Sequence, residues 1–443
     1  MVYQLLAQLF RFALRVYFSK IEIQQLANMP TKGPLVIVAN HRASFLDPIL
    51  IACLINRPLH FIARGESFNH PLKRWIWRQL NMIPIYRPQF TPKLVKQNVQ
   101  VFQHCHELLQ EGGAILIFPE GISRTDLALR PIKTGAARIA LGALSYAPDL
   151  KVIPIGINYS NPHQFRSKVL LNIGVPIAVK DFKTSPSADK RTSIYALCEA
   201  IRSALKKQVI VVNPPEQQAI FQMVERIYKK ELEVGPPELP RPGNRSFVIS
   251  QDIKSAIQWL QQHPNMELEF LQNRMARFLT QLDFYGIQCP YALYKAMNDH
   301  PNRFAWRHWC FLLCSLPHQL PLRLTKWLTH RFTRRMDFIG PLYLCLGVLI
   351  GLLYYGGVFL LLMNSAMSWP LMIGLLLYWL GSAWLGIQLF ERLEGERAAM
   401  AVQRLRRASH YHYGRLLAEH RAIMREFRRL RELFIRDYGL KSA

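Results

Sequence analysis

A histidine and an aspartate lie close together between an apolar run and a helix-like segment. The run Pro34–Ala39 predicts a buried strand, and Asp47 followed by Pro48–Ile55 predicts a helix start. We therefore expect His41 in the turn and Asp47 at or near the helix cap. The pair is typical of a catalytic dyad, in which the carboxylate fixes the imidazole tautomer and the histidine removes a hydroxyl proton. A solvated loop histidine beside an ordinary N-cap aspartate is the alternative that this stretch leaves open.

A second candidate is a glutamate that follows another buried run. The apolar run Ala114–Phe118 ends in Pro119, Glu120 and Gly121, which places Glu120 at the C-terminal edge of a predicted strand. A carboxylate there can accept a hydrogen bond from a substrate hydroxyl or orient a neighbouring arginine. A turn glutamate in a tight proline–glycine bend is the simpler alternative.

Three cations complete the set of candidate residues. Lys133 stands at the start of a predicted helix, Thr134–Ser145, whose free N–H groups and dipole favour an anion. Arg87 directly follows the last residue of the predicted strand Met82–Tyr86. Three residues separate Arg124 from Glu120. Together these cations could form a phosphate cradle. Solvated surface cations are the alternative for each of them.

The overall charge also indicates an anionic partner. The chain of 443 residues has a formal net charge of +27. It shows no zinc-finger spacing, RNP-like aromatic motif or helix-turn-helix signature, so we do not expect nucleic acid. Phosphorylated substrates and anionic lipid headgroups remain. The scattered cysteines lack a CxxC motif and fit a reducing compartment, and His104–His106 matches no zinc pattern, so no metal is predicted.

Strand and helix signals alternate over the first half of the chain, which predicts an α/β fold with a sheet flanked by helices. The predicted strands are Leu35–Ala39, Leu59–Ala63, Met82–Tyr86, Ala114–Phe118, Val152–Asn158 and Val169–Ile173. The predicted helices between and after them are Pro48–Ile55, Pro71–Leu80, Pro92–Gln110, Thr134–Ser145 and Ser193–Gln208.

We expect five parts along the chain. They are an amphipathic N-terminal helix with its connector (1–30), the α/β domain (31–212), a helical region with a proline-rich linker (213–337), a membrane hairpin (338–390) and a basic helical tail (391–443). The first helix could lie on a membrane interface or pack on its own domain. The tail could lie on anionic lipid or be a solvated helix held by ion pairs.

The membrane hairpin rests on an uncharged stretch. Residues 338–390 contain no Asp, Glu, Lys or Arg, and the stretch divides near Asn364–Met367 into two halves long enough to span a bilayer. Basic residues flank it on both sides, while the connecting turn has no charge. By the positive-inside rule, both flanks and the α/β domain should face the cytoplasm.

The order of these motifs resembles the four acyltransferase blocks of the glycerolipid (PlsC-type) family over residues 30–180. The series is His41 to Asp47, then Pro84–Arg87, then Phe118–Gly121, then Val152–Ile155. Five residues separate His41 from Asp47 where the family usually has four. That spacing, the stretch Leu129–Leu144 and the late membrane segment resemble the fungal-type glycerol-3-phosphate/dihydroxyacetone-phosphate acyltransferases and their bacterial relatives. The third block has Ile122 where threonine is usual.

The resemblance implies an acyl-CoA or acyl-carrier-protein donor and a phosphorylated glycerol or lysophospholipid acceptor, with no cofactor. By carry-over, His41 is the general base and Asp47 its partner, while Arg87, Glu120 and Gly121 belong to the acceptor and phosphate site. We assign Ser123, Arg124 and Lys133 to substrate binding beside them. A lysophospholipid remodelling acyltransferase and a catalytically inactive, membrane-anchored scaffold are the alternatives.

Overall fold

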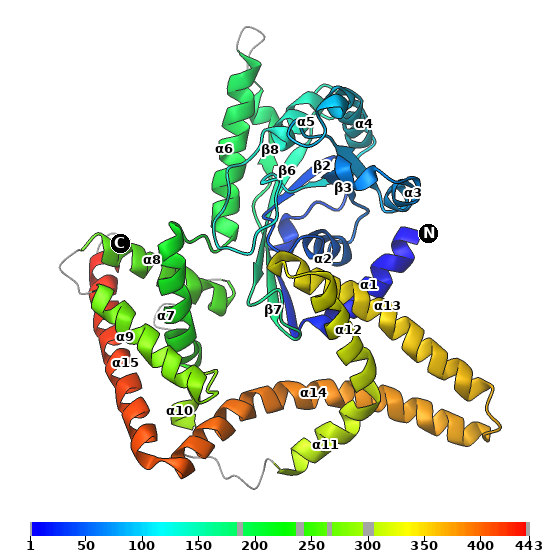
Figure 1. Ribbon diagram of the computed structural model, residues 1–443. Helices are drawn as coiled ribbons and strands as arrows, with labels where there is room; N and C mark the ends of the chain where they lie inside the picture. Colours follow the sequence, from blue (N-terminus) through cyan, green and yellow to red (C-terminus); the bar gives the residue numbers. More distant parts are fainter. Residues whose placement is uncertain (1, 184–188, 236–242, 264–267, 296–304, 440–443) are drawn as a thin grey trace. The chain divides into compact units, whose positions relative to one another are not determined.

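The computed structural model describes residues 2–183, 189–235, 243–263, 268–295 and 305–439. The chain divides into two compact units, residues 1–211 with 321–356, and residues 212–320 with 357–443 (Figure 1). The proline-rich linker lies mostly outside the described residues, since only Gly235 and Gly243 of it are described.

An eight-stranded mixed sheet forms the centre of the first unit, in the order β1-β7-β6-β2-β5-β3-β4, with β8 paired to β6. All pairs are parallel except those that β6 makes with β7 and β8. The strands are β1 (Lys20–Gln24), β2 (Leu35–Ala39), β3 (His60–Arg64), β4 (Met82–Ile85), β5 (Ala114–Ile117), β6 (Lys151–Tyr159), β7 (Lys168–Ile173) and β8 (Ile177–Ala178).

Helices cover both faces of this sheet. The helices in the sheet-containing segment are α1 (Val2–Tyr17), α2 (Leu46–Leu54), α3 (Pro71–Gln79), α4 (Asn98–Gln110), α5 (Gly135–Ala143) and α6 (Lys190–Gln208). The central strand β2 is apolar at every position and fully buried, as expected for a parallel strand covered on both sides.

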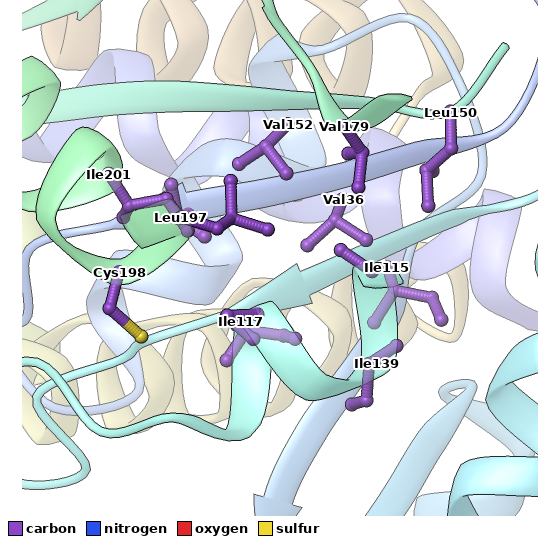
Figure 2. Packing of buried hydrophobic residues seen from close by; sticks show 14 of the residues in the cluster. Val36, Ile115, Ile117, Ile139, Leu150, Val152, Val179, Leu197, Cys198 and Ile201 are labelled. Atoms are coloured by element: carbon purple, nitrogen blue, oxygen red, sulfur yellow. The ribbon is translucent and has the colours of Figure 1, made fainter. Parts of the chain in front are cut away.

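Side chains that alternate along β2 enter two different cores. Val36 and Val38 pack with residues of α4, α5 and α6, and Figure 2 shows Val36 with Ile115, Ile139 and Ile201 in this layer. Leu35, Ile37 and Ala39 instead pack with α1 and α2 on the opposite face. The period of two in a strand produces this division, and it makes the sheet a rigid support for the loops at its C-terminal edge.

The structure confirms the predicted fold class, a mixed sheet flanked by helices and followed by a helical region. All six predicted strands are present, and their ends differ from the prediction by at most one residue. The sequence analysis missed two strands, β1 and β8. The first is a mixed polar strand at the sheet edge, and the second is only two residues long, so neither carries a clear apolar run.

The N-terminal helix α1 packs on its own domain through one side. Leu14, Tyr17 and Phe18 are buried in the core that α1 shares with α2. Leu5 and Phe12 lie on its outer side and remain 71% and 68% exposed. Of the two predictions for this segment, packing on its own domain is therefore observed. The outer side of the helix is apolar and exposed.

Two helices are long and apolar enough to cross a membrane, namely Met336–Met363 (α13) and the segment Trp369–Leu393 of α14. Only 11% and 6% of their most apolar stretches are buried, so neither is enclosed as a helix of a soluble core would be. The preceding helix α12 (Gln319–Phe332) and α13 each cross the boundary between the two units.

The second unit is helical. Its helices are α7 (Pro215–Val234), α8 (Arg245–Gln261), α9 (Leu268–Phe284), α10 (Ala292–Lys295), α11 (Ala305–Ser315), α14 (Trp369–Ala408) and α15 (His410–Gly439). The predicted tail is not one helix, because α14 continues to Ala408 and a break at Ser409 separates it from α15. Buried Leu416, Ile423 and Phe427 pack α15 onto its own unit, and Arg274 pairs with Glu419 at 2.6 Å.

Candidate active site

The loop after β2 begins with a buried asparagine that extends the sheet. The Asn40 side chain donates to the carbonyl of Ile157 at 3.0 Å and accepts from the N–H of Ile157 at 2.7 Å. These two bonds imitate a backbone ladder between β2 and β6 one residue beyond the end of β2. The next residue, His41, therefore leaves the sheet from a fixed point.

Asp47 stabilises the loop after β2 through hydrogen bonds to its carboxylate. Its carboxylate is fully buried in the first turn of α2. One oxygen, Oδ2, accepts from the backbone N–H groups of Arg42 and Ala43, both at 2.9 Å, and lies 2.8 Å from His41 Nδ1. The other, Oδ1, accepts from the Tyr159 hydroxyl at 2.7 Å. A buried carboxylate is tolerated when its lone pairs are satisfied in this way.

The histidine ring is oriented on two sides. Its Nδ1 faces Asp47, and its plane stacks on Phe118 with a centroid distance of 4.2 Å. The side chain is 17% exposed. Because Nδ1 is engaged, Nε2 is the nitrogen available to a substrate hydroxyl, and the arrangement can serve general-base chemistry.

The loop after β5 is bound directly to the histidine loop. Glu120 accepts from the N–H of His41 with Oε1 and from the N–H of Arg130 with Oε2, both at 3.0 Å. Ser123 Oγ accepts from the N–H of Ser44 at 2.8 Å, and the N–H of Arg124 donates to the carbonyl of His41 at 3.1 Å. These three contacts each involve backbone of the histidine loop, and the side chain of Arg42 adds a further contact through Nη2 to the carbonyl of Thr125 at 3.4 Å.

Glu120 and Ser123 are buried, and burial raises the pKa of Glu120 even though its two backbone hydrogen bonds oppose that shift. Both oxygens of the Glu120 carboxylate already accept hydrogen bonds from backbone N–H groups of the protein. In this structure it positions the histidine loop, and the side chain of Arg124 is exposed beside it.

Basic side chains gather at the same edge of the sheet. Arg87 Nη1 points to the carbonyl of Gly121 at 3.4 Å, and the Lys133 side chain lies against Gly121, where a Cβ would come within 2.8 Å of Nζ. Gly121 also has φ +70°, so both the backbone conformation and the lack of space for a Cβ favour glycine at this position. Burial lowers the pKa of Lys133, and the positive charges of Arg87 and Arg64 lower it further.

One carboxylate partly balances this cluster. Glu66 accepts from Arg87 Nη2 at 3.1 Å, and the guanidinium of Arg87 also lies 4.2 Å above the ring of Phe90. Arg335 and Asp337 add one charge of each sign near Arg64, so Arg64, Arg87 and Lys133 keep a surplus of positive charge. That surplus suits a phosphate dianion.

The structure thus brings the predicted site residues to one edge of the sheet. His41, Asp47, Glu120, Ser123 and Arg124 belong to two loops in direct contact. Arg87, Gly121 and Lys133 form the adjoining cationic part, although Lys133 precedes the cap of α5 and is not in the helix itself. Among the residues that the structure describes, no group of His, Cys, Asp and Glu is arranged to hold a metal ion.

Several residues of the site escaped the sequence analysis. Asn40 and Tyr159 act through distant partners, 117 and 112 residues away, and no local pattern reveals such pairs. Burial and the nearby Asp47 carboxylate raise the pKa of Tyr159, which keeps its hydroxyl a proton donor. Arg64 ends β3 just as Arg87 follows β4, so the strand-edge argument used for Arg87 could have found it.

We expect Glu120→Gln to loosen the histidine loop. A glutamine offers one acceptor oxygen, so one of the two backbone N–H groups would face an amide N–H₂ and remain unpaired. An unpaired buried N–H costs about 1–3 kcal/mol, so the thermal midpoint of the detergent-solubilised chain should fall. Glu107→Gln on the exposed side of α4 is the control and should leave the midpoint unchanged. Equal midpoints for both variants would contradict this role of Glu120.

The chain is similar to known acyltransferases over its sheet-containing segment. The family model described as Acyltransferase matches residues 20–158. The chain is 31% identical over 147 residues to glycerol-3-phosphate O-acyltransferase 1 of Saccharomyces cerevisiae, a match that covers 32% of this chain and 19% of the yeast protein. It is 33% identical over 124 residues to the chloroplastic 1-acyl-sn-glycerol-3-phosphate acyltransferase BAT2 of Brassica napus, covering 28% and 34%.

A solved structure, the 1-acyl-sn-glycerophosphate acyltransferase PlsC of Thermotoga maritima, is 20% identical with a TM-score of 0.33 and covers 45% of this chain and 78% of that one. The chain spans about a fifth of the length of the yeast relative and a third of the Brassica relative. The matched segment contains β1 to β5, β6 as far as Asn158, and every residue of the site described above except Tyr159. Residues 20–158 of this chain therefore match the acyltransferase family model, and the similarity to the two named relatives supports the same assignment for this segment.

Proposed function

We propose that this protein is a membrane-bound acyltransferase that transfers a fatty acyl group from acyl-CoA or acyl carrier protein to a glycerol-phosphate-type acceptor in phospholipid biosynthesis. The observation that carries the proposal is the hydrogen bond between His41 Nδ1 and the buried Asp47 carboxylate, next to a cluster of cations. The dyad suits a hydroxyl nucleophile, and the cations suit a phosphate on the same acceptor.

The transfer needs no covalent enzyme intermediate. His41 Nε2 takes the proton from the acceptor hydroxyl as its oxygen attacks the thioester carbonyl. The carbon–sulfur bond then breaks, and the thiolate that leaves takes up the proton from the imidazolium. Asp47 holds the ring and stabilises its positive charge during this step. The reaction as written requires neither a metal nor a cofactor.

Arg87, Lys133 and Arg64 are the residues that we assign to the acceptor phosphate. Burial lowers the pKa of Lys133, and repulsion by Arg87 and Arg64 lowers it further; an incoming phosphate would relieve that repulsion. Arg87 is mostly buried and has two partners, so its guanidinium is held in place before an acceptor arrives. Lys133 and Arg124 are exposed and can adapt to acceptors of different size.

The relatives support two acceptors, glycerol 3-phosphate and 1-acylglycerol 3-phosphate, because their names state these activities. Both acceptors carry a free hydroxyl and a phosphate, so the same dyad and cations serve either one. We propose the membrane hairpin as the anchor that keeps the domain close to lipid products. Its basic flanks favour an orientation with the acyltransferase domain on the cytoplasmic side, next to soluble acyl donors.

Removal of the histidine should abolish the chemistry. We expect His41→Ala to lower kcat by about 10²–10⁴, the usual contribution of a general base. Purified protein would be assayed with labelled acyl-CoA and acyl carrier protein against glycerol 3-phosphate, dihydroxyacetone phosphate, 1-acylglycerol 3-phosphate and a lysophospholipid without a free phosphate. His104→Ala on the exposed side of α4 is the control. Near wild-type turnover by His41→Ala would refute the dyad, and transfer to none of the acceptors would refute the proposed function.

The cationic cluster should determine acceptor affinity. Arg87→Ala is expected to raise KM for a phosphorylated acceptor by roughly ten- to a hundredfold, the effect of losing charge-assisted hydrogen bonds. Lys133→Ala should do the same to a smaller extent because its ammonium group is exposed. Arg138→Ala, an exposed cation on α5, is the control. A rise confined to the KM of the donor would reassign the cluster to the donor phosphates.

The orientation of the hairpin can be tested with two matched substitutions. Ala366 lies in the turn between α13 and α14, and Ala408 ends α14; both are exposed. In a background without cysteine, an impermeant maleimide applied to intact cells should label Ala366→Cys and leave Ala408→Cys unlabelled until the cells are opened. Labelling of Ala408→Cys alone would reverse the proposed orientation.

A further inference from the structure

Helix α3 connects β3 to β4, and none of its nine described residues is buried. A helix that joins two parallel strands usually lays its apolar side on the sheet. Here the apolar residues Leu72, Trp75 and Ile76 are 60%, 60% and 38% exposed. The helix therefore has an amphipathic pattern whose apolar side is turned away from its own domain.

Contacts on the opposite side fix this orientation. At about 100° per residue, Leu72, Trp75 and Ile76 fall within an arc of about 100°. Arg74 and Trp77 lie on the other side of the helix, where Arg74 Nη2 donates to the carbonyl of Phe68 at 3.5 Å and Trp77 Nε1 donates to the carbonyl of Ser67 at 2.9 Å. These contacts connect α3 to the turn before it through the side of the helix opposite the apolar stripe.

The composition of α3 indicates what covers that stripe. The helix has three cations, Lys73, Arg74 and Arg78, and its sequence contains no acidic residue. Lys73 and Arg78 flank the apolar stripe, one on each side. An apolar stripe with tryptophan between cations is typical of a helix that lies in the interface of a bilayer with anionic lipid.

The same unit contains the start of a membrane-spanning candidate, α13, held against the acyltransferase domain. A Cβ at Gly340 would lie 2.0 Å from the carbonyl of Pro162, and the rings of Phe338 and Phe45 are 6.0 Å apart. Close packing at both points fixes where α13 leaves the domain.

That exit point adjoins the segment that leads to α3. Arg335 and Asp337, at the start of α13, act electrostatically on Arg64, the last residue of β3. From Arg64 the chain reaches α3 through one short 3₁₀ turn, Gly65–Phe68. Figure 1 shows β3, this turn and α3 in succession within the first unit. The segment that leads to α3 therefore begins beside the start of α13.

We propose that α3 is a second membrane contact, which lies on the anionic bilayer surface through Leu72, Trp75 and Ile76 and brings the cationic edge of the site down to the lipid headgroups. The inference rests on the membrane assignment made under the proposed function. It adds that the domain is held to the membrane at two places, the hairpin and α3. An acceptor embedded in the bilayer would then meet Arg64 and Arg87 without leaving the membrane.

The test measures the depth of spin labels in the full chain, reconstituted in nanodiscs of phosphatidylcholine with or without phosphatidylglycerol. Labels at Ile76→Cys, Leu349→Cys on α13 and Tyr195→Cys on α6 would be compared by their relative collision rates with oxygen and a nickel chelate. All three positions are exposed within the first unit. The unsubstituted chain, with its native cysteines, provides the blank.

We expect the oxygen preference at residue 76 to be severalfold above that at residue 195, below that at residue 349, and greater with phosphatidylglycerol. Equal oxygen preferences at residues 76 and 195 in both lipids would overturn the proposal. Protection of the label at residue 76 from both reagents, increasing with protein concentration, would also overturn it, because it would indicate that a second copy of the chain covers α3. A water-like value at 349 would instead overturn the membrane hairpin. Because the readout involves no turnover, an inactive enzyme would leave this result intact.

Tryptophan quenching gives a second measurement that needs no added cysteine. Brominated phospholipids should quench the native chain, and Trp75→Phe should remove more of the quenched signal than Trp77→Phe, whose ring lies on the inner side. Equal losses from the two variants, or no loss from either, would contradict the proposed orientation of α3 on the membrane.

Discussion

The buried carboxylate of Asp47 is the interaction on which the site depends. It accepts hydrogen bonds from two backbone N–H groups of the loop that carries His41. It is also hydrogen-bonded to the hydroxyl of Tyr159 and to the imidazole of His41. Without it, those N–H groups would be buried and unpaired, so the loop conformation and the histidine orientation have the same cause. Asp47 therefore determines both the loop conformation and the proposed chemistry. A substitution of Asp47 changes both unless the new side chain still accepts these hydrogen bonds.

The mixed sheet explains why distant segments meet at this carboxylate. Strands β2, β5, β3 and β4 run parallel, so their C-terminal ends lie at one edge of the sheet. Those ends supply the histidine loop, the Glu120 loop and two arginines, Arg64 and Arg87. Hydrogen bonds from backbone and side-chain groups join the first two loops into one element. Arg87 is attached to the same element through the carbonyl of Gly121.

Strands with long apolar runs were predictable because burial on both faces requires apolar residues at every position, as in β2 and β5. The position of His41 and Asp47 followed from the same runs. The roles of Glu120, Asn40 and Tyr159 did not, since each depends on a partner far along the chain. The outward side of α3 could not be predicted either, because an amphipathic pattern does not say which neighbour covers it.

The most direct test of the account is the rate of the chemical step in Asp47→Asn. Asparagine can keep its oxygen toward His41, Arg42 and Ala43 and turn its amide toward Tyr159, whose hydroxyl can accept as well as donate. The fold and substrate affinities should survive while the negative charge is lost. In single-turnover acyl transfer we predict a fall of about 10²–10⁴ in rate with unchanged acceptor binding. A rate within about twofold of wild type, in a protein shown to bind acceptor normally, would contradict the claim that the Asp47 charge supports His41 as the base.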